Sequence, residues 1–194
     1  MLVQKPGCRR TALEHLGEPC GLIILAAPFP LHIEGVPPEA QASLQPILDQ
    51  SFHGIYRWHA RRTLRSVTWV REATRENAKL GLSMSMMLGQ GSGYIYYVAV
   101  APSQRAKGVG GFLLDDAITL LRSEGAVEIF ACARYINTPS IRLLQSRDFR
   151  KTGFCKLAGL KGFAGAARLW MQMVVAPGEK VYELRFAVSA YPTV

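Results

Sequence analysis

The segment SQRAKGVGGFLLDDA, residues 103–117, holds three glycines and two basic residues within the seven positions 105–111. It follows YIYYVAV, residues 94–100, whose β-branched and aromatic residues predict a strand. After it, apolar residues recur at 109, 112, 113, 117, 120 and 121, which predicts a helix ending before Gly125. A strand, a glycine-rich loop and a helix in this order favour an α/β fold in which bare backbone N–H groups at a helix N-terminus bind an anion.

Two nucleotide-binding motifs do not fit this loop. A Walker A loop needs Ser or Thr after Gly-Lys, whereas Gly110 and Gly111 are followed by Phe112. A dinucleotide fingerprint needs a third glycine where this chain has Leu113, and an acidic residue at the end of the next strand, which is missing. The pattern that remains is R-x-x-G-x-G, beginning at Arg105.

The rest of the chain alternates between strand-like and helix-like stretches. Strands are predicted at 66–73, 80–88, 127–133 and 168–175, and helices at 38–52, at 54–65 and after Asn137, an N-cap ahead of Pro139. The early strand pair looks antiparallel, so the pattern predicts a mixed α/β sandwich. We expect one domain over residues 37–176, an N-terminal extension of uncertain structure at 1–36 and a C-terminal tail at 177–194.

A second motif, NTPSIRLLQSRDF at residues 137–149, follows the strand VEIFACA. Together the two motifs resemble the pyrophosphate loop and the N-x-x-[AS]-I-x-L-Y-x-x-x-G-F segment of the GCN5-related N-acetyltransferases (GNAT). The resemblance covers roughly residues 38–175 and is strongest over 94–150. It implies a mixed, mostly antiparallel central sheet flanked by helices. It also implies an N-acetyltransferase that moves an acetyl group directly from acetyl-CoA to an amine of a small molecule or peptide.

The resemblance further implies how acetyl-CoA binds. The pantetheine arm would pair with main-chain groups of the strand 94–100, and Asn137 matches the family asparagine that contacts this arm. The pyrophosphate would lie on N–H groups at the helix start, where Gly108 and Gly110 permit close approach and Arg105 and Lys107 add charge. The expected cofactor-binding residues are Val98, Ala99, Val100, Arg105, Ala106, Lys107, Gly108, Val109, Gly110, Gly111, Asn137 and Ser140.

Acetyl transfer also needs an oxyanion donor and, in many cases, an acid for the departing thiolate. By the resemblance, a backbone N–H around Val100 is the oxyanion donor. The family's acidic tyrosine corresponds to Leu144, and the glycine four residues later corresponds to Asp148. Tyr135 or Ser140 would replace that tyrosine, or the thiolate leaves unaided, since a thiol pKa of about 8.5 allows it. A catalytically silent acyl-CoA-binding module is the alternative.

The base that deprotonates the amine has three candidates. Tyr94 occupies the position where histone-acetylating members carry a glutamate, and Tyr96 shares its face of the strand. A phenol of pKa about 10 would act only through water. Glu72 is the alternative carboxylate. The competing interpretation is that both tyrosines pack the sheet and that Glu72 pairs with an arginine.

The formal charge of +9 suits a phosphorylated cofactor and also raises nucleic acid as a partner. Aromatic residues lie among the arginines of one basic stretch: Tyr56, Trp58 and Trp69 among Arg57, Arg61, Arg62 and Arg65. No nucleic-acid-binding motif accompanies them, which disfavours this alternative. If these arginines wall the acceptor side, we expect an amine with a nearby carboxylate or phosphate. Otherwise they form a solvated outer face or bind the cofactor's 3′-phosphate.

The cysteine pattern and the length of the apolar runs bear on metal binding and on the cellular location of the protein. Its four cysteines form no C-x-x-C pair, and Cys8, His15, Cys20 and His32 match no zinc spacing. No run approaches the roughly 18 apolar residues of a membrane helix. We expect a cytoplasmic enzyme without a metal, whose partners are acetyl-CoA and an amine acceptor, and we leave a homodimer open.

Overall fold

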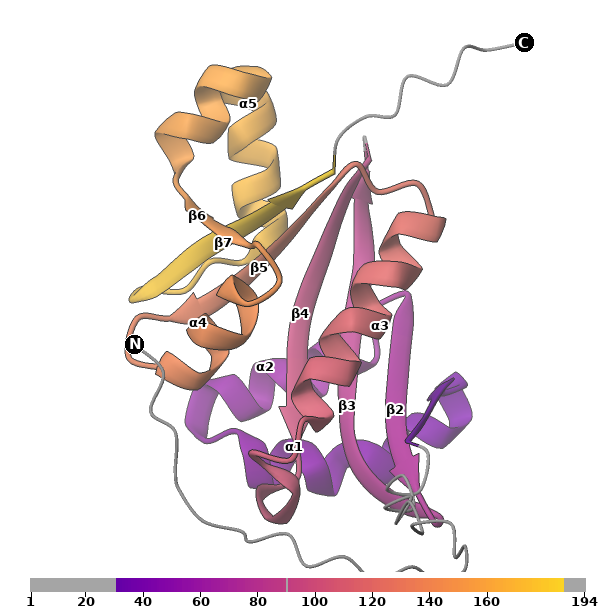
Figure 1. Ribbon diagram of the computed structural model, residues 1–194. Coiled ribbons are helices and arrows are strands. Elements are labelled where there is room, and N and C mark those ends of the chain that lie inside the picture. The colour runs from indigo at the N-terminus through magenta and orange to yellow at the C-terminus, as the bar shows by residue number, and fades with distance from the viewer. Residues whose placement is uncertain (1–30, 90, 187–194) are drawn as a thin grey trace, which may run out of the picture.

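A computed structural model describes residues 31–89 and 91–186, which form one seven-stranded sheet (Figure 1). The strand order is β1-β2-β3-β4-β5-β7-β6, and every neighbouring pair is antiparallel except β4 and β5. The strands are β1 (His32–Gly35), β2 (Trp69–Arg75), β3 (Ala78–Gly89), β4 (Ser92–Val100), β5 (Glu128–Arg134), β6 (Arg150–Thr152) and β7 (Glu179–Arg185). The expected mixed, mostly antiparallel sheet is confirmed.

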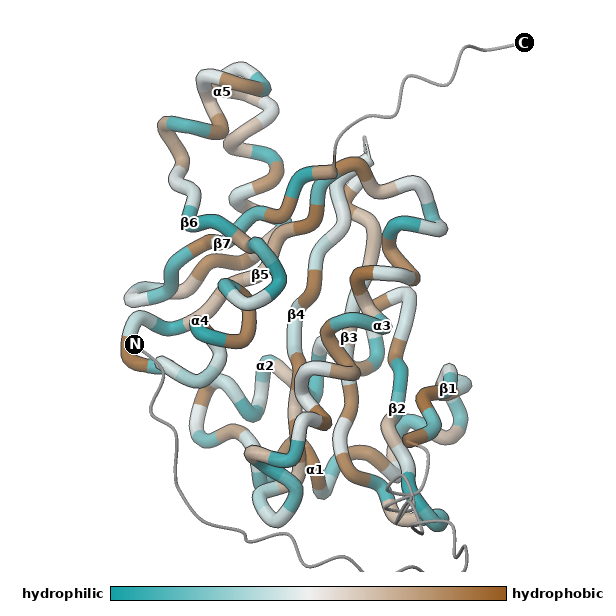
Figure 2. The backbone as a smooth tube through the Cα atoms, viewed as in Figure 1, coloured by the Kyte–Doolittle hydropathy of each residue, from teal (hydrophilic) through white to brown (hydrophobic). Residues whose placement is uncertain are grey.

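Helices cover both faces of this sheet. They are η1 (Pro38–Leu44), α1 (Gln45–Ser51), α2 (Gly54–Leu64), η2 (Pro102–Gln104), α3 (Val109–Ser123), α4 (Thr138–Gln145) and α5 (Phe154–Met173). Leu48 and Leu64 of α1 and α2 pack on one face against Met84. On the other face, Leu114 of α3 packs against Ile129. Hydrophobic residues recur along β4, β5 and α3, whereas the edge strand β6 is hydrophilic (Figure 2).

The strongest sequence patterns gave the right elements. The strand predicted at 94–100 lies within β4, and the helix predicted at 109–124 is α3. Asn137 is the N-cap of α4, and its Oδ1 accepts a hydrogen bond from the Ser140 N–H at 3.3 Å. Such a cap satisfies a backbone donor that the first helical turn leaves free. Local sequence signals were therefore sufficient to predict the helices and the strand around the glycine-rich loop.

The strand predicted at 168–175 is wrong, because this segment belongs to helix α5. Ala166, Leu169 and Met173 are buried at helical spacing, and the backbone leaves helical geometry only at Gly162, where φ is 73°. The domain bounds also need correction. Strand β7 lies in the segment expected to be a tail and pairs with both β5 and β6, and β1 extends the sheet into the expected N-terminal extension. The rest of that extension, residues 1–30, lies outside the described residues.

A β-bulge interrupts the pairing of β4. Met84 faces Tyr97 and Ser85 faces Ile95, so Tyr96 is an extra residue in β4. A bulge bends its strand and increases the local twist. The parallel ladder between β4 and β5 covers only Ser92–Ile95, and beyond it the two strands diverge (Figure 1). The bulge thus coincides with the opening of a gap in the middle of the sheet.

Candidate functional site

A cavity of about 1040 Å³ opens at this gap. Its walls come from α2, from β4 and β5, from the start of α4, and from the chain between the end of α5 and the start of β7. Ligand sites commonly hold about 300–1,000 Å³. The cavity is therefore at the upper end of this range and has room for an extended ligand.

Backbone groups of β4 face the gap on one side. Ala101 donates its N–H to Leu80 of β3, and main-chain directions alternate along a strand. By this alternation Ala99 pairs with β3, while the N–H and C=O of Val98 and Val100 point away from β3. The Val100 carbonyl accordingly accepts the Arg105 Nε–H at 3.3 Å. An extended ligand could bind along this side of β4 as a missing strand would.

The N-terminus of α3 lies at one end of the gap. Gly108 is its N-cap with φ of 84°, a left-handed conformation that favours glycine. Among the described residues, no carbonyl accepts the N–H of Val109 or Gly110. A Cβ at Gly110 would lie 3.6 Å from both Leu143 of α4 and Val100 of β4, so these free donors lie beside the divergent strands. Free N–H groups at the positive end of a helix dipole suit an anion.

Two further expected cofactor residues, Asn137 and Ser140, line the cavity together with Val98. The Asn137 carboxamide oxygen is used by the cap to Ser140, which leaves the amide NH₂ available for a ligand. Arg105 and Lys107 are exposed on the loop before α3. Of the expected cofactor residues, Val98, Asn137 and Ser140 thus line the cavity, whereas Val100 and the loop 105–111 lie outside its lining.

Tyr94 and Tyr96 line the cavity, and both hydroxyls are hydrogen-bonded. They donate to the carbonyls of Met173 and Gln172, each at 3.0 Å. Burial raises the pKa of both phenols, well above its ordinary value for Tyr94. Both side chains are therefore protonated at neutral pH and tie β4 to the end of α5.

The other predicted catalytic residues lie elsewhere. Glu72 on β2 does not line the cavity, and its partner is Lys79 at 2.8 Å rather than an arginine. Tyr135 is 63% exposed and is also outside the lining. Leu144 packs in the core beneath α4. The position of the family tyrosine is thus occupied by a core residue.

The pair formed by His59 on α2 and Tyr97 on β4 was not predicted from the sequence. The His59 Nδ1 lies 2.8 Å from the Tyr97 hydroxyl and 3.2 Å from the Thr63 hydroxyl. Burial lowers the pKa of His59, so the imidazole is neutral at pH 7. The spacing of Tyr56, His59 and Thr63 on one helix face was the available signal.

Glu179, at the start of β7, was also missed. It lines the cavity, and its Oε2 accepts the Ala176 N–H at 2.9 Å. Cys132 of β5 lines the cavity as well, but burial raises the pKa of its thiol to about 12. The thiol is therefore a poor nucleophile at neutral pH.

The basic residues of α2 face outward. None of Arg57, Arg61, Arg62 and Arg65 lines the cavity, and all four are exposed. Arg61 forms an ion pair with Asp49. These positions favour the solvated-face interpretation over a role in acceptor binding. The arginine that does line the cavity is Arg134, whose Cζ lies 5.4 Å from the Tyr56 ring centroid.

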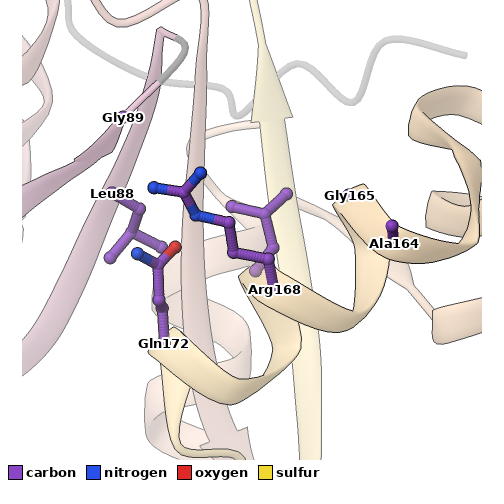
Figure 3. A pocket seen from close by; sticks show the side chains of 7 residues that line it. Leu88, Gly89, Ala164, Gly165, Arg168 and Gln172 are labelled. Atoms are coloured by element: carbon purple, nitrogen blue, oxygen red, sulfur yellow. The ribbon is translucent and has the colours of Figure 1, made fainter.

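A smaller cavity of about 230 Å³ lies between the end of β3 and α5 (Figure 3). Arg168 and Gln172 of α5 reach toward Leu88 there. Within residues 31–89 and 91–186, no group of three potential metal ligands is present. In the same part of the chain, no helix is long and apolar enough to cross a membrane.

Residues 34–149 match the acetyltransferase (GNAT) family, so the chain belongs to this family, as its two motifs indicated. No curated protein matches the sequence.

Solved structures show the same fold. The ribosomal-protein-S18-alanine N-acetyltransferase of Escherichia coli has 13% identity and a TM-score of 0.61, covering 84% of this chain and 99% of its own. A Bacillus subtilis acetyltransferase in complex with CoA has 18% identity and a TM-score of 0.61, and the match covers 81% of this chain and 100% of the other. The PaiA N-acetyltransferase of Thermoplasma acidophilum, also in complex with coenzyme A, has 10% identity with the same TM-score and coverage.

Proposed function

We propose that this protein is an N-acetyltransferase that uses acetyl-CoA and acts on a primary amine in a ternary complex. The observation that carries the proposal is the end of the β4–β5 ladder at Ile95, where a cavity opens whose walls include β4 and α4, and both of these elements contact the N-terminus of α3 at Gly110. An open strand edge can pair with amide groups, and a glycine-capped helix start can hold a pyrophosphate. Family membership and the CoA complexes of two structural neighbours support this assignment.

In this proposal each part of the gap has a separate role in holding the cofactor. The main-chain groups of Val98 and Val100 pair with the pantetheine amides, and the Asn137 NH₂ contacts the same arm. The pyrophosphate lies on the N–H groups from Lys107 to Gly110, with Arg105 at the rim. The thioester lies beyond these amides, so a backbone N–H of β4 nearer the bulge at Tyr96 serves its oxygen as a donor.

His59 is the proposed proton acceptor. The His59 Nδ1 lies 2.8 Å from the Tyr97 oxygen, and in the tautomer that donates Nδ1–H to it the imidazole keeps a lone pair on Nε2 for the ammonium proton of the acceptor. The amine nitrogen then bonds to the acetyl carbon, and the carbon–sulfur bond breaks. The thiolate leaves with the bonding pair and takes up, through water, the second proton that the nitrogen loses on becoming an amide, since α4 carries no tyrosine to supply one. Tyr97 acts here as a positioning residue.

A catalytically silent acyl-CoA-binding module is the second candidate. The burial of Leu144 and the position of Tyr135 outside the cavity favour it. The test measures CoA binding by calorimetry and thiol release from acetyl-CoA with a panel of amines. Binding with turnover supports the enzyme, and binding without turnover on any amine supports the silent module. Absence of CoA binding by the folded protein overturns both.

A further inference from the structure

The part of the cavity next to α2 has aromatic walls. Phe52, Tyr56, Tyr96 and Tyr97 all line it, and the rings of Phe52 and Tyr97 meet edge to face with centroids 4.9 Å apart. Aromatic faces bind apolar bodies and attract a cation over the ring. This wall therefore suits an apolar substrate that carries positive charge.

One carboxylate, that of Glu179, lines the same cavity as these aromatic side chains. Glu179 is the acidic residue among those that line the cavity, and within the described part of the chain no Lys or Arg nitrogen lies within 4.0 Å of it. The Ala176 N–H fixes one oxygen of the carboxylate. Burial, followed by the Glu179 charge, raises the pKa of both Tyr56 and Tyr97, and the Arg134 charge opposes this rise at Tyr56.

The cavity also holds a cation of the protein. Arg134 lines it, lies over the Tyr56 ring and is opposite Glu179 in the pairing of β5 with β7. The Arg134 charge repels a second cation on the substrate. One ammonium is thus attracted by Glu179, whereas a polyamine brings further charges toward Arg134.

From these three features we infer that the acceptor is a primary monoamine on an aromatic or branched apolar body, with its ammonium bound by Glu179. The inference rests on the proposed acetyl transfer and specifies its acceptor. It replaces the acidic acceptor suggested by the arginines of α2, because those arginines do not line the cavity. Glu179 holds the ammonium in the cavity until His59 takes its proton.

The experiment compares wild type with Glu179→Gln, using 2-phenylethylamine as acceptor and spermidine as competitor substrate. Gln retains an oxygen for the Ala176 N–H but removes the charge. We expect the KM for 2-phenylethylamine to rise about ten- to a hundredfold, the cost of losing a charged partner, with CoA affinity unchanged. Glu124→Gln, on the exposed end of α3, is the matched control and should leave KM unchanged.

A second measurement needs no variant and so remains valid if Glu179→Gln does not fold. Binding of 2-phenylethylamine and of 2-phenylethanol to the wild-type protein with CoA is compared by calorimetry. At least tenfold tighter binding of the amine supports the inference. Equal binding, or faster acetylation of spermidine than of 2-phenylethylamine, overturns it while leaving acetyl transfer intact. Failure to bind CoA instead overturns the proposed function, and the inference with it.

Discussion

The His59 imidazole on α2 and the Tyr97 hydroxyl on β4 lie 2.8 Å apart, directly after the bulge of β4. The bulge bends β4 at this point, and the pair joins that strand to α2, which forms one wall of the cavity. The pair therefore places His59, the proposed proton acceptor, at the point where the sheet opens.

The pH profile should report on His59. Because burial lowers its pKa below the ordinary 6.5, the imidazole is blocked by a proton only under acidic conditions. We expect kcat/KM to fall as pH drops below about 6.5 and to stay level above it until the ammonium of the amine deprotonates near pH 10. Steady-state rates from pH 5 to 10 test this.

The matching variant is His59→Gln, which should lower kcat about a hundredfold and remove the acidic limb. His32→Gln, on the exposed strand β1, serves as the control. An acidic midpoint above 6.5, or a profile that survives His59→Gln, would show that another group is the base.

Gly110 should be required for CoA binding and not for folding. A Cβ there makes only ordinary contacts at 3.6 Å, so Gly110→Ala should fold with a Tm at least as high as that of the wild type. Gly110→Trp should raise the Kd for CoA at least tenfold, because its side chain lies over the free N–H groups. Arg105→Ala should weaken binding more at low salt than at high salt. Unchanged CoA affinity in a folded Gly110→Trp would contradict the pyrophosphate assignment.

Leu144→Tyr should destabilise the protein without raising turnover. Leu144 is 6% exposed in the core between α4 and the sheet, so a phenol there overfills the site and buries a hydroxyl. We expect a loss of about 1–3 kcal/mol in the free energy of unfolding. Leu144→Met conserves volume and should cost less than about 1.5 kcal/mol. Denaturant unfolding measures both, and faster turnover at unchanged stability would mean that the hydroxyl reaches the cavity.

Gly81 should be intolerant of a methyl group. A Cβ at this position of β3 would lie 2.6 Å from the Ala99 carbonyl oxygen, so β4 would have to move. Gly81→Ala should lower the free energy of unfolding by about 1–3 kcal/mol and weaken CoA binding. Gly159→Ala is the control, since nothing lies within 4 Å there and a helical Ala stabilises by about 0.5–1 kcal/mol. Equal stability of the two variants would rule out this steric account.

The sequence predicted the parts of the site whose signals are local. The glycine loop before α3 and the cap at Asn137 each depend on a few neighbouring residues, and both lie where the motifs placed them. The bulge at Tyr96 depends on the register with β3, which no local pattern encodes. His59 and Glu179 are far apart in the sequence, and only the fold brings both of them to the wall of one cavity. Helix α5 was missed because its apolar run was interpreted with the strand period rather than the helical one.

The gap between β4 and β5 makes the sheet an incomplete structure in the free protein. If CoA pairs with Val98 and Val100 as proposed, the amide protons of these residues exchange quickly with solvent until the ligand arrives and slowly afterwards. A ligand that binds only the folded state adds about 2.7 kcal/mol to the free energy of unfolding at a hundred times its Kd. The lifetime of this protein in a cell would then follow the supply of its own substrate, and starvation for acetyl-CoA would leave it more open to proteolysis.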